Sequence, residues 1–208
     1  MFIYAFGSIC RGEIDFYSDV DLLVVIDNIN EAKNFDPDKY SIYTLKRLKE
    51  YWVQGNPFAW HLYKESSLIF SETGIDIIKT LEKPENYTNG INDLVKFKKI
   101  FSDSVSQIYL TRDSFLFDLS TVFLSIRNFA TCYSLMSGSY NFRRNSALQL
   151  GANSLRIDKE CYKLLESSRL LATRGIGEFP NCEDSNKIID SLDLIENWMN
   201  TLLEDVRV

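Results

Sequence analysis

The chain has 208 residues, of which 45% are hydrophobic, and a formal net charge of −6 from 23 basic and 29 acidic side chains. This length suffices for one large domain or two small ones with a sizeable core. The acidic balance argues against a general nucleic-acid-binding protein, which would present a basic surface. Long nucleic acid is therefore not an expected partner, although a short RNA at a local patch such as Arg143-Arg144 stays open.

No apolar stretch is long enough to span a membrane, and no cleavable signal precedes the first predicted strand. The four cysteines are scattered without the spacing of a metal site, which favours free thiols in a reducing compartment. We therefore expect a cytoplasmic protein without a membrane partner.

The N-terminal part of the sequence alternates short β-rich runs with turns. Strands are predicted over residues 2–6, 21–26 and 40–45. A helix over residues 46–54 should end at Gly55-Asn56-Pro57, because this run is a strong stop signal. Residues 58–70 are predicted as an apolar stretch, a turn near residues 64–66 and a short strand.

After a linker at residues 84–90 the pattern becomes helical, with apolar side chains at three- and four-residue intervals. The run 114–136 is apolar on nearly all sides, as expected for the central helix of a bundle. Further helices are predicted over residues 142–150, over 159–173 with Asp158 as N-cap and Gly175 at the end, and along the stripe from Ile188 to Val206. The predicted fold class is α+β, with a small mixed β-sheet domain over residues 1–85 and an α-helical bundle over residues 91–208.

The most informative motif is Gly7-Ser8, followed after ten residues by Asp19-Val20-Asp21. Side chains alternate along a strand, so Asp19 and Asp21 should point the same way and repel each other unless a cation lies between them. Such oxygen ligands suit Mg²⁺ or Mn²⁺. The Gly-Ser turn offers backbone N–H groups and a hydroxyl for a phosphate. The motif therefore predicts a site for a metal–nucleotide complex.

This motif, extended by the Arg-Gly and Ser-Asp pairs within it, resembles the nucleotidyltransferase superfamily of DNA polymerase β type. It is similar above all to the small bacterial branch of minimal and antibiotic nucleotidyltransferases. The matching positions are Gly7, Ser8, Arg11, Gly12, Ser18, Asp19, Asp21, Leu22, Leu23 and Val24.

The resemblance implies an enzyme that transfers a nucleoside monophosphate from a nucleoside triphosphate (NTP) to a hydroxyl acceptor, with Mg²⁺ or Mn²⁺. It implies Asp19 and Asp21 as catalytic metal ligands. Four further residues would bind nucleotide phosphates: Gly7, Ser8, Arg11 and Ser18. The acceptor, either a small molecule such as an antibiotic or a protein, stays open, as does a homodimer.

The sequence departs from the family in a third carboxylate, which relatives usually carry on the third strand. The position aligned with that acid is Ser41. Three explanations are open: Asp38 reaches the site, Glu65 enters from the next segment, or the site binds nucleotide and metal but catalyses poorly. Because Glu65 falls in a predicted turn, we expect it at the surface or at a hinge. The one histidine, His61, is expected to be held by a hydrogen bond rather than to act as a general base.

The helical part resembles the second domain of kanamycin-type nucleotidyltransferases or the HEPN fold. The HEPN ribonuclease motif needs an arginine and a histidine a few residues apart on one helix, and no histidine follows Arg127. The alternative to an active enzyme is a catalytically weak or inactive nucleotide-binding regulatory module of the antitoxin type.

Overall fold

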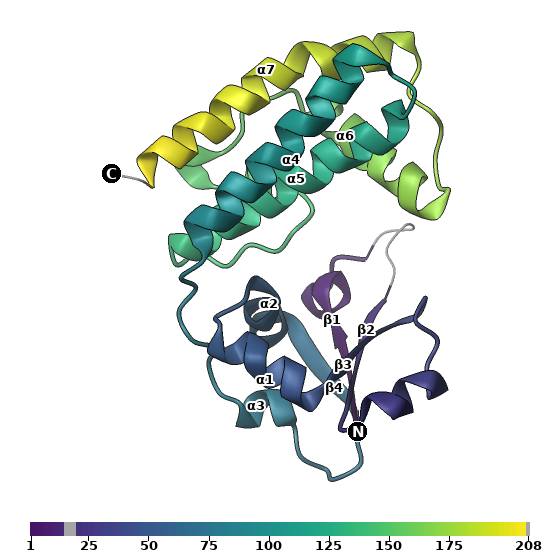
Figure 1. Ribbon diagram of the computed structural model, residues 1–208, viewed down its shortest axis with the longest axis vertical. Helices are drawn as coiled ribbons and strands as arrows, with labels where there is room; N and C mark the ends of the chain where they lie inside the picture. The colour runs from purple at the N-terminus through teal and green to yellow at the C-terminus, as the bar shows by residue number, and fades with distance from the viewer. Residues whose placement is uncertain (15–19, 207–208) are drawn as a thin grey trace. The chain divides into compact units, whose positions relative to one another are not determined.

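The computed structural model describes residues 1–14 and 20–206 of the chain. The chain divides into two compact units, Met1–Thr88 and Asn89–Val208 (Figure 1). Each unit is described by itself. The candidate site residues Ser18 and Asp19 lie outside the described residues.

A four-stranded mixed sheet forms the centre of the first unit. Its strands are β1 (Phe2–Phe6), β2 (Asp21–Ile26), β3 (Tyr40–Thr44) and β4 (Ser66–Ser71), in the order β3-β2-β1-β4. Strand β1 is antiparallel to both β2 and β4, whereas β2 and β3 are parallel. The predicted strands therefore form, and together with the helical second unit they confirm the α+β class.

Short helices pack on this sheet and connect its strands. They are the 3₁₀ helices η1 (Gly7–Arg11) and η2 (Ile29–Asn34) and the α-helices α1 (Leu45–Val53), α2 (Pro57–Glu65) and α3 (Ile77–Thr80). The core lies between one face of the sheet and these α-helices. Its buried side chains include Tyr4 and Leu23 from the sheet, Leu48 from α1 and Leu62 from α2. Burial of these apolar groups holds the unit together.

The prediction for residues 58–70 was wrong in its first half, because this stretch is helical. Asn56 caps α2 by accepting a hydrogen bond from the backbone N–H of Phe58 at 2.9 Å, and Pro57 occupies the first helical position. Proline suits that position because its missing N–H would be unpaired there anyway. Gly55-Asn56-Pro57 was predicted to end a helix, and its last two residues also begin the next one. Helix α2 continues to Glu65, and β4 follows directly.

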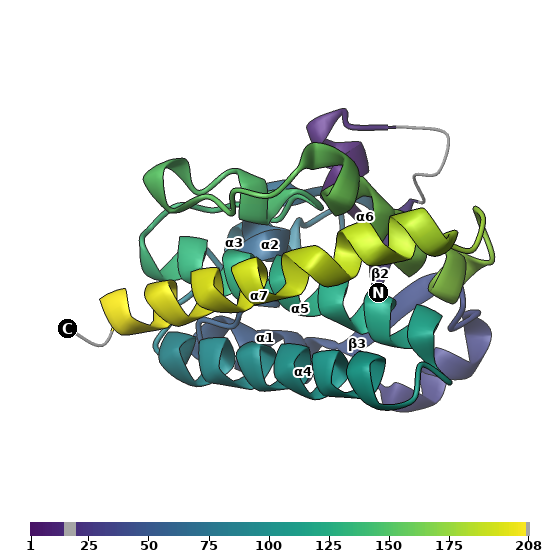
Figure 2. The ribbon, with the colours of Figure 1, turned by 90° about the horizontal axis from the view of Figure 1, so that it is seen from above.

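The second unit consists of four long helices. They are α4 (Gly90–Leu110), α5 (Phe115–Met136), α6 (Lys159–Arg174) and α7 (Cys182–Asp205), and Figure 2 shows α4, α5 and α7 side by side. Helix α5 packs against α4, α6 and α7. It buries residues around its whole circumference, from Leu119 and Val122 to Phe129 and Leu135. The prediction of a central helix is confirmed.

The predicted ends of α6 are also confirmed. The Asp158 side chain accepts a hydrogen bond from the Glu160 N–H at 2.9 Å, which satisfies one of the unpaired N–H groups at a helix start. Gly175 ends the helix in the left-handed conformation, where a glycine avoids the steric cost of a side chain.

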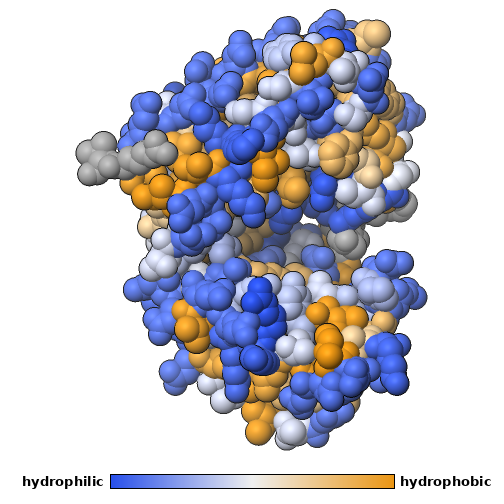
Figure 3. Space-filling view, in the orientation of Figure 1, coloured by the Kyte–Doolittle hydropathy of each residue, from blue (hydrophilic) through white to orange (hydrophobic). Residues whose placement is uncertain are grey.

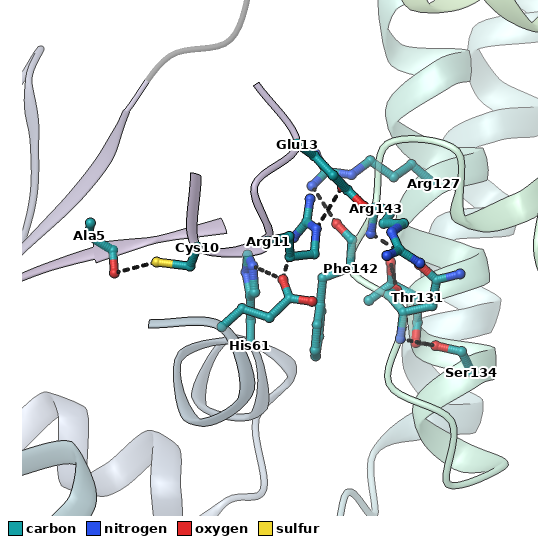
Figure 4. Close-up of polar contacts among 12 residues, drawn as sticks. Ala5, Cys10, Arg11, Glu13, His61, Arg127, Thr131, Ser134, Phe142 and Arg143 are labelled. Atoms are coloured by element: carbon teal, nitrogen blue, oxygen red, sulfur yellow. Dashed lines mark hydrogen bonds and ion pairs between the residues drawn. The ribbon is translucent and has the colours of Figure 1, made fainter. Parts of the chain in front are cut away.

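The helix predicted over residues 142–150 was wrong. This segment contains only the 3₁₀ turn η3 (Ser146–Leu148), and a second turn, η4 (Gly151–Asn153), follows it. Side chains of α5 bind its first carbonyl groups: Thr131 donates to Asn141 O at 3.2 Å, and Arg127 donates to Phe142 O at 3.3 Å (Figure 4). Because these carbonyls are bonded to α5, they do not serve as acceptors within a local helix.

Hydrophilic side chains cover much of the face of each unit seen in Figure 3, with hydrophobic residues in separate patches. In the part of the chain that the structure describes, none of the helices has the length and apolar character needed to cross a membrane.

Candidate functional site

The turn after β1 brings Gly7 against a carboxylate. Gly7 has a φ of +77°, and a Cβ atom added to it would lie 2.9 Å from Asp21 Oδ2 and 3.9 Å from His61 Cε1. A side chain at Gly7 would therefore meet both the unfavourable backbone conformation and the Asp21 carboxylate. The glycine of the Gly-Ser motif is required here for a close approach of backbone and acid.

Asp21 is placed by the register of the sheet. It opens β2 directly opposite Phe6, the last residue of β1, and its side chain is half-buried. Paired residues of neighbouring strands share a face, so Asp21 lies on the same face as Phe6, at the edge of the apolar core. The described part of the motif thus places a carboxylate beside the turn that follows β1.

A pocket of about 410 Å³ opens where β2 and β3 begin. Its lining includes Asp21, Asp38 and Ser41, which offer carboxylate and hydroxyl oxygens. Asp38, one of the two acids considered as the missing carboxylate, therefore lines the pocket of Asp21. Ser41, the position aligned with that carboxylate, lines it as well. Oxygen donors of this kind are the ligands that Mg²⁺ and Mn²⁺ prefer.

The register of β3 places Ser41 on the face of Asp21. Ser41 pairs with Leu23, which is two residues beyond Asp21 and therefore on the same side of the strand. The strand reads Tyr-Ser-Ile-Tyr-Thr and contains no acidic residue. An acid at the Ser41 position would thus lie on the Asp21 face, and β3 offers only a hydroxyl there.

Glu65 is the last residue of α2 and its side chain is largely buried, so the predicted turn and the expected surface position were wrong. Its Oε2 accepts a hydrogen bond from Arg11 and lies 3.0 Å from His61 Nε2. Arg11 also donates from Nε to Glu13 at 2.8 Å (Figure 4). The side chains of Arg11, Glu65 and His61 are only 13%, 13% and 14% exposed.

The sequence offered a signal for this cluster that depends on recognising α2. His61 and Glu65 are four residues apart, which places them on the same face of a helix. When residues 64–66 are read as a turn, this relation is lost.

The cluster shifts the ionisation of Glu65. Burial alone raises the pKa of this carboxyl, but the hydrogen bond and charge of His61 and the charge and hydrogen bond of Arg11 outweigh it, and the pKa lies below its ordinary value. Arg11 likewise has a raised pKa: burial lowers it, but the hydrogen bond to Glu13 and the charge of Glu65 outweigh burial. The cluster therefore favours a charged Arg11–Glu65 pair.

Among the described residues, no group of three or more His, Cys, Asp or Glu side chains is arranged to hold a metal ion. Asp19 is not among the described residues. The donor set of the pocket, Asp21 with Asp38 and Ser41, is nevertheless chemically suited to a hard divalent cation.

Comparison with known proteins agrees with the geometry of the first unit. Residues 2–101 match a family model described as a nucleotidyltransferase domain. No curated protein shows significant sequence similarity to the chain. One similar solved structure is that of a nucleotidyltransferase-like protein from Exiguobacterium sibiricum 255-15. The match includes 98% of this chain and 68% of the other protein's chain, with 15% sequence identity and a TM-score of 0.37.

Residues 2–101 of the chain are therefore similar to the nucleotidyltransferase domain family. Of the motif positions named from the sequence, all except Ser18 and Asp19 lie within the described residues.

The first prediction concerns Gly7. We expect Gly7→Ala to lower the free energy of unfolding by about 1–2 kcal/mol from the left-handed backbone alone, and by more because Asp21 must move. Gly12→Ala is the matched control, since Gly12 has a φ of +69° but a Cβ there meets no described atom within 4 Å. Urea unfolding checks the difference. Equal losses in the two variants would contradict the close approach of Asp21.

The second prediction concerns pH. Because the pKa of Glu65 is lower in the folded than in the unfolded protein, its ionised form stabilises the fold above the ordinary value of 4.5. This stabilisation is lost as the pH falls through the lower, folded value. We expect the difference in unfolding free energy between the wild type and Glu65→Gln to shrink on acidification below that ordinary value. Urea unfolding across this range tests it, and a constant difference would contradict it.

Proposed function

We propose that this protein transfers a nucleoside monophosphate from an NTP to a hydroxyl acceptor. The observation that carries the proposal is the Asp21 carboxylate beside the Gly7 turn, in a unit that is similar to the nucleotidyltransferase domain family. The proposal includes the finer division of the chain into a nucleotidyltransferase domain over residues 1–85 and a helical bundle domain over residues 91–208.

The turn supplies the phosphate-binding groups in this proposal. Gly7 and Ser8 offer backbone N–H groups and a hydroxyl, and Ser8 is half-buried, with its carbonyl accepting from the Glu13 N–H at 3.0 Å. Ser18 and Arg11 complete the set of phosphate-binding residues that we propose.

Asp19 and Asp21 are the proposed metal ligands, with Asp38 and Ser41 as further oxygen donors of the same pocket. Mg²⁺ or Mn²⁺, when bound, would neutralise charge on the triphosphate and the leaving pyrophosphate. The residues of the chain orient the α-phosphorus for in-line attack by the acceptor hydroxyl, and positioning supplies much of the acceleration.

The acceptor that we propose is a small molecule or a protein. The net charge of −6 favours a cationic small molecule, such as an aminoglycoside antibiotic, or a protein over long RNA.

One observation favours a second candidate function. Strand β3 presents a serine on the Asp21 face, and Glu65 is engaged by Arg11 and His61. A site in which neither β3 nor Glu65 supplies the third carboxylate, and Asp38 does not replace it, would bind nucleotide and metal while catalysing slowly. The chain would then be a nucleotide-binding regulatory module of the antitoxin type.

Turnover separates the two functions. We expect the wild type, incubated with Mg²⁺, a labelled NTP and candidate acceptors, to release pyrophosphate and label an acceptor. Asp21→Asn should reduce this transfer at least about a hundredfold, because electrostatic groups at a phosphoryl centre have effects of that size. Asp27→Asn is the matched control, since Asp27 is exposed just beyond the other end of β2. Intact NTP under all conditions would favour the regulatory module, and full transfer by Asp21→Asn would contradict the site.

The role of Ser41 has its own test. Ser41→Asp should strengthen Mn²⁺ binding by about tenfold, because a further carboxylate on the Asp21 face adds an anionic ligand. Ser67→Asp places the same charge at an exposed position of β4 and serves as the control. Titration calorimetry with Mn²⁺ measures both. An unchanged affinity in Ser41→Asp would show that Ser41 does not reach the metal shell.

A further inference from the structure

One carboxylate connects the two ends of the turn that we propose as the phosphate-binding element. The Glu65 Oε2 atom accepts from Arg11, the last residue of η1, and lies 3.0 Å from His61 Nε2. The His61 ring in turn lies beside the start of the same turn, with Cε1 close to Gly7. Glu65, a residue of α2, therefore bonds Arg11 directly and contacts His61, whose ring lies next to Gly7.

The Gly7–Arg11 turn is a short 3₁₀ helix, and two further backbone hydrogen bonds close its C-terminal end. Within it, the Gly12 N–H donates to Ile9 O at 3.2 Å and the Glu13 N–H donates to Ser8 O at 3.0 Å. Hydrogen bonds of a short 3₁₀ helix have poor geometry and stabilise it weakly. The tether from Arg11 to Glu65 spans 54 positions of sequence and anchors the end of the turn to a packed helix.

The bond between Arg11 and Glu65 is much less exposed to solvent than an ordinary surface ion pair. Arg11 and Glu65 are each 13% exposed, whereas the side chains of the Arg47–Glu50 pair on α1 are 50% and 40% exposed. Removing the Glu65 charge leaves the largely buried Arg11 with Glu13 as its acidic partner but without its bond to α2, whereas breaking an exposed pair costs little. The position of the turn should therefore depend on Glu65.

The ring of His61 is held by contacts with Phe6 and Glu65. Phe6 packs edge-on against it, with the ring centroids 5.6 Å apart, and Glu65 Oε2 lies 3.0 Å from Nε2. The edge of the imidazole that carries Cε1 is thereby held towards Gly7.

We propose that Glu65 is the positioning residue of the Gly7–Arg11 turn, acting through Arg11 and His61 rather than as a metal ligand. The part of this inference that concerns nucleotide rests on the proposed function. Glu65 then sets the affinity for the NTP phosphates without touching them, and the charge of Arg11 is shared with Glu65 and Glu13.

Hydrogen exchange of the full-length protein without nucleotide tests the positioning directly. In Glu65→Gln we expect the Gly12 and Glu13 amides to exchange about tenfold faster, because the turn opens locally without its tether. Arg11→Met should have the same effect and serves as a second variant should Glu65→Gln not fold. Unchanged exchange at both amides would overturn the proposal.

Two controls separate positioning from general loss of stability. Glu50→Gln breaks the exposed pair on α1, and Ile78→Val weakens the core of the same unit at α3. We expect less than a twofold change at the Gly12 and Glu13 amides in each. Faster exchange in Ile78→Val equal to that in Glu65→Gln would show that Glu65 acts only through stability, and would also overturn the proposal.

A calorimetric titration with Mg²⁺ and ATP measures whether Glu65 also affects nucleotide affinity. The dissociation constant should rise about tenfold in Glu65→Gln, with partial rescue in Glu65→Asp, which keeps the charge. If the wild type binds no nucleotide, the proposed function fails while the exchange data still decide whether Glu65 positions the turn. Equal nucleotide affinity in the wild type and in Glu65→Gln would contradict the functional part of the inference.

Discussion

The close approach of the Asp21 carboxylate to Gly7 is the constraint on which the candidate site depends. It requires a residue without a side chain at the end of β1, a left-handed backbone there, and a register that sets Asp21 opposite Phe6. The antiparallel pairing of β1 and β2 supplies this register. The apolar residues of both strands therefore have a second role, since their burial places an acid beside the turn.

The acids around this turn differ from the family pattern, in which the third strand carries a third carboxylate. Ser41 occupies the face of Asp21 on β3, while Glu65 is bound by Arg11 and His61. A carboxylate with two cationic or hydrogen-bonding neighbours is stabilised as an anion and ties its neighbours together. We interpret Glu65 as a support of the turn, and the oxygen donors of the Asp21 pocket as the groups available to a metal.

Much of this fold follows from local sequence patterns. The strands around the Gly-Ser motif are bounded by clear changes in hydrophobicity, and Asp158 and Gly175 mark the ends of α6 by well-understood capping chemistry. Helix α2 was not predicted because Asn56-Pro57 both follows the end of α1 and begins α2. Without this helix, the proximity of His61 and Glu65 could not be predicted either. The absent helix over residues 142–150 depends on hydrogen bonds to α5, and such tertiary contacts leave no local pattern.

Mapping nucleotide binding by NMR tests the central claim most directly. On titration of the full-length protein with Mg²⁺ and a non-hydrolysable ATP analogue, the account predicts that the largest amide shifts occur at Gly7 and Ser8. A second pocket of about 630 Å³, whose lining includes Lys46 and Lys49 together with Asp27 and Glu50, offers a competing site in the same unit. Shifts concentrated at Lys46 and Lys49, with Gly7 and Ser8 unaffected, would contradict the assignment of the Gly7–Asp21 site.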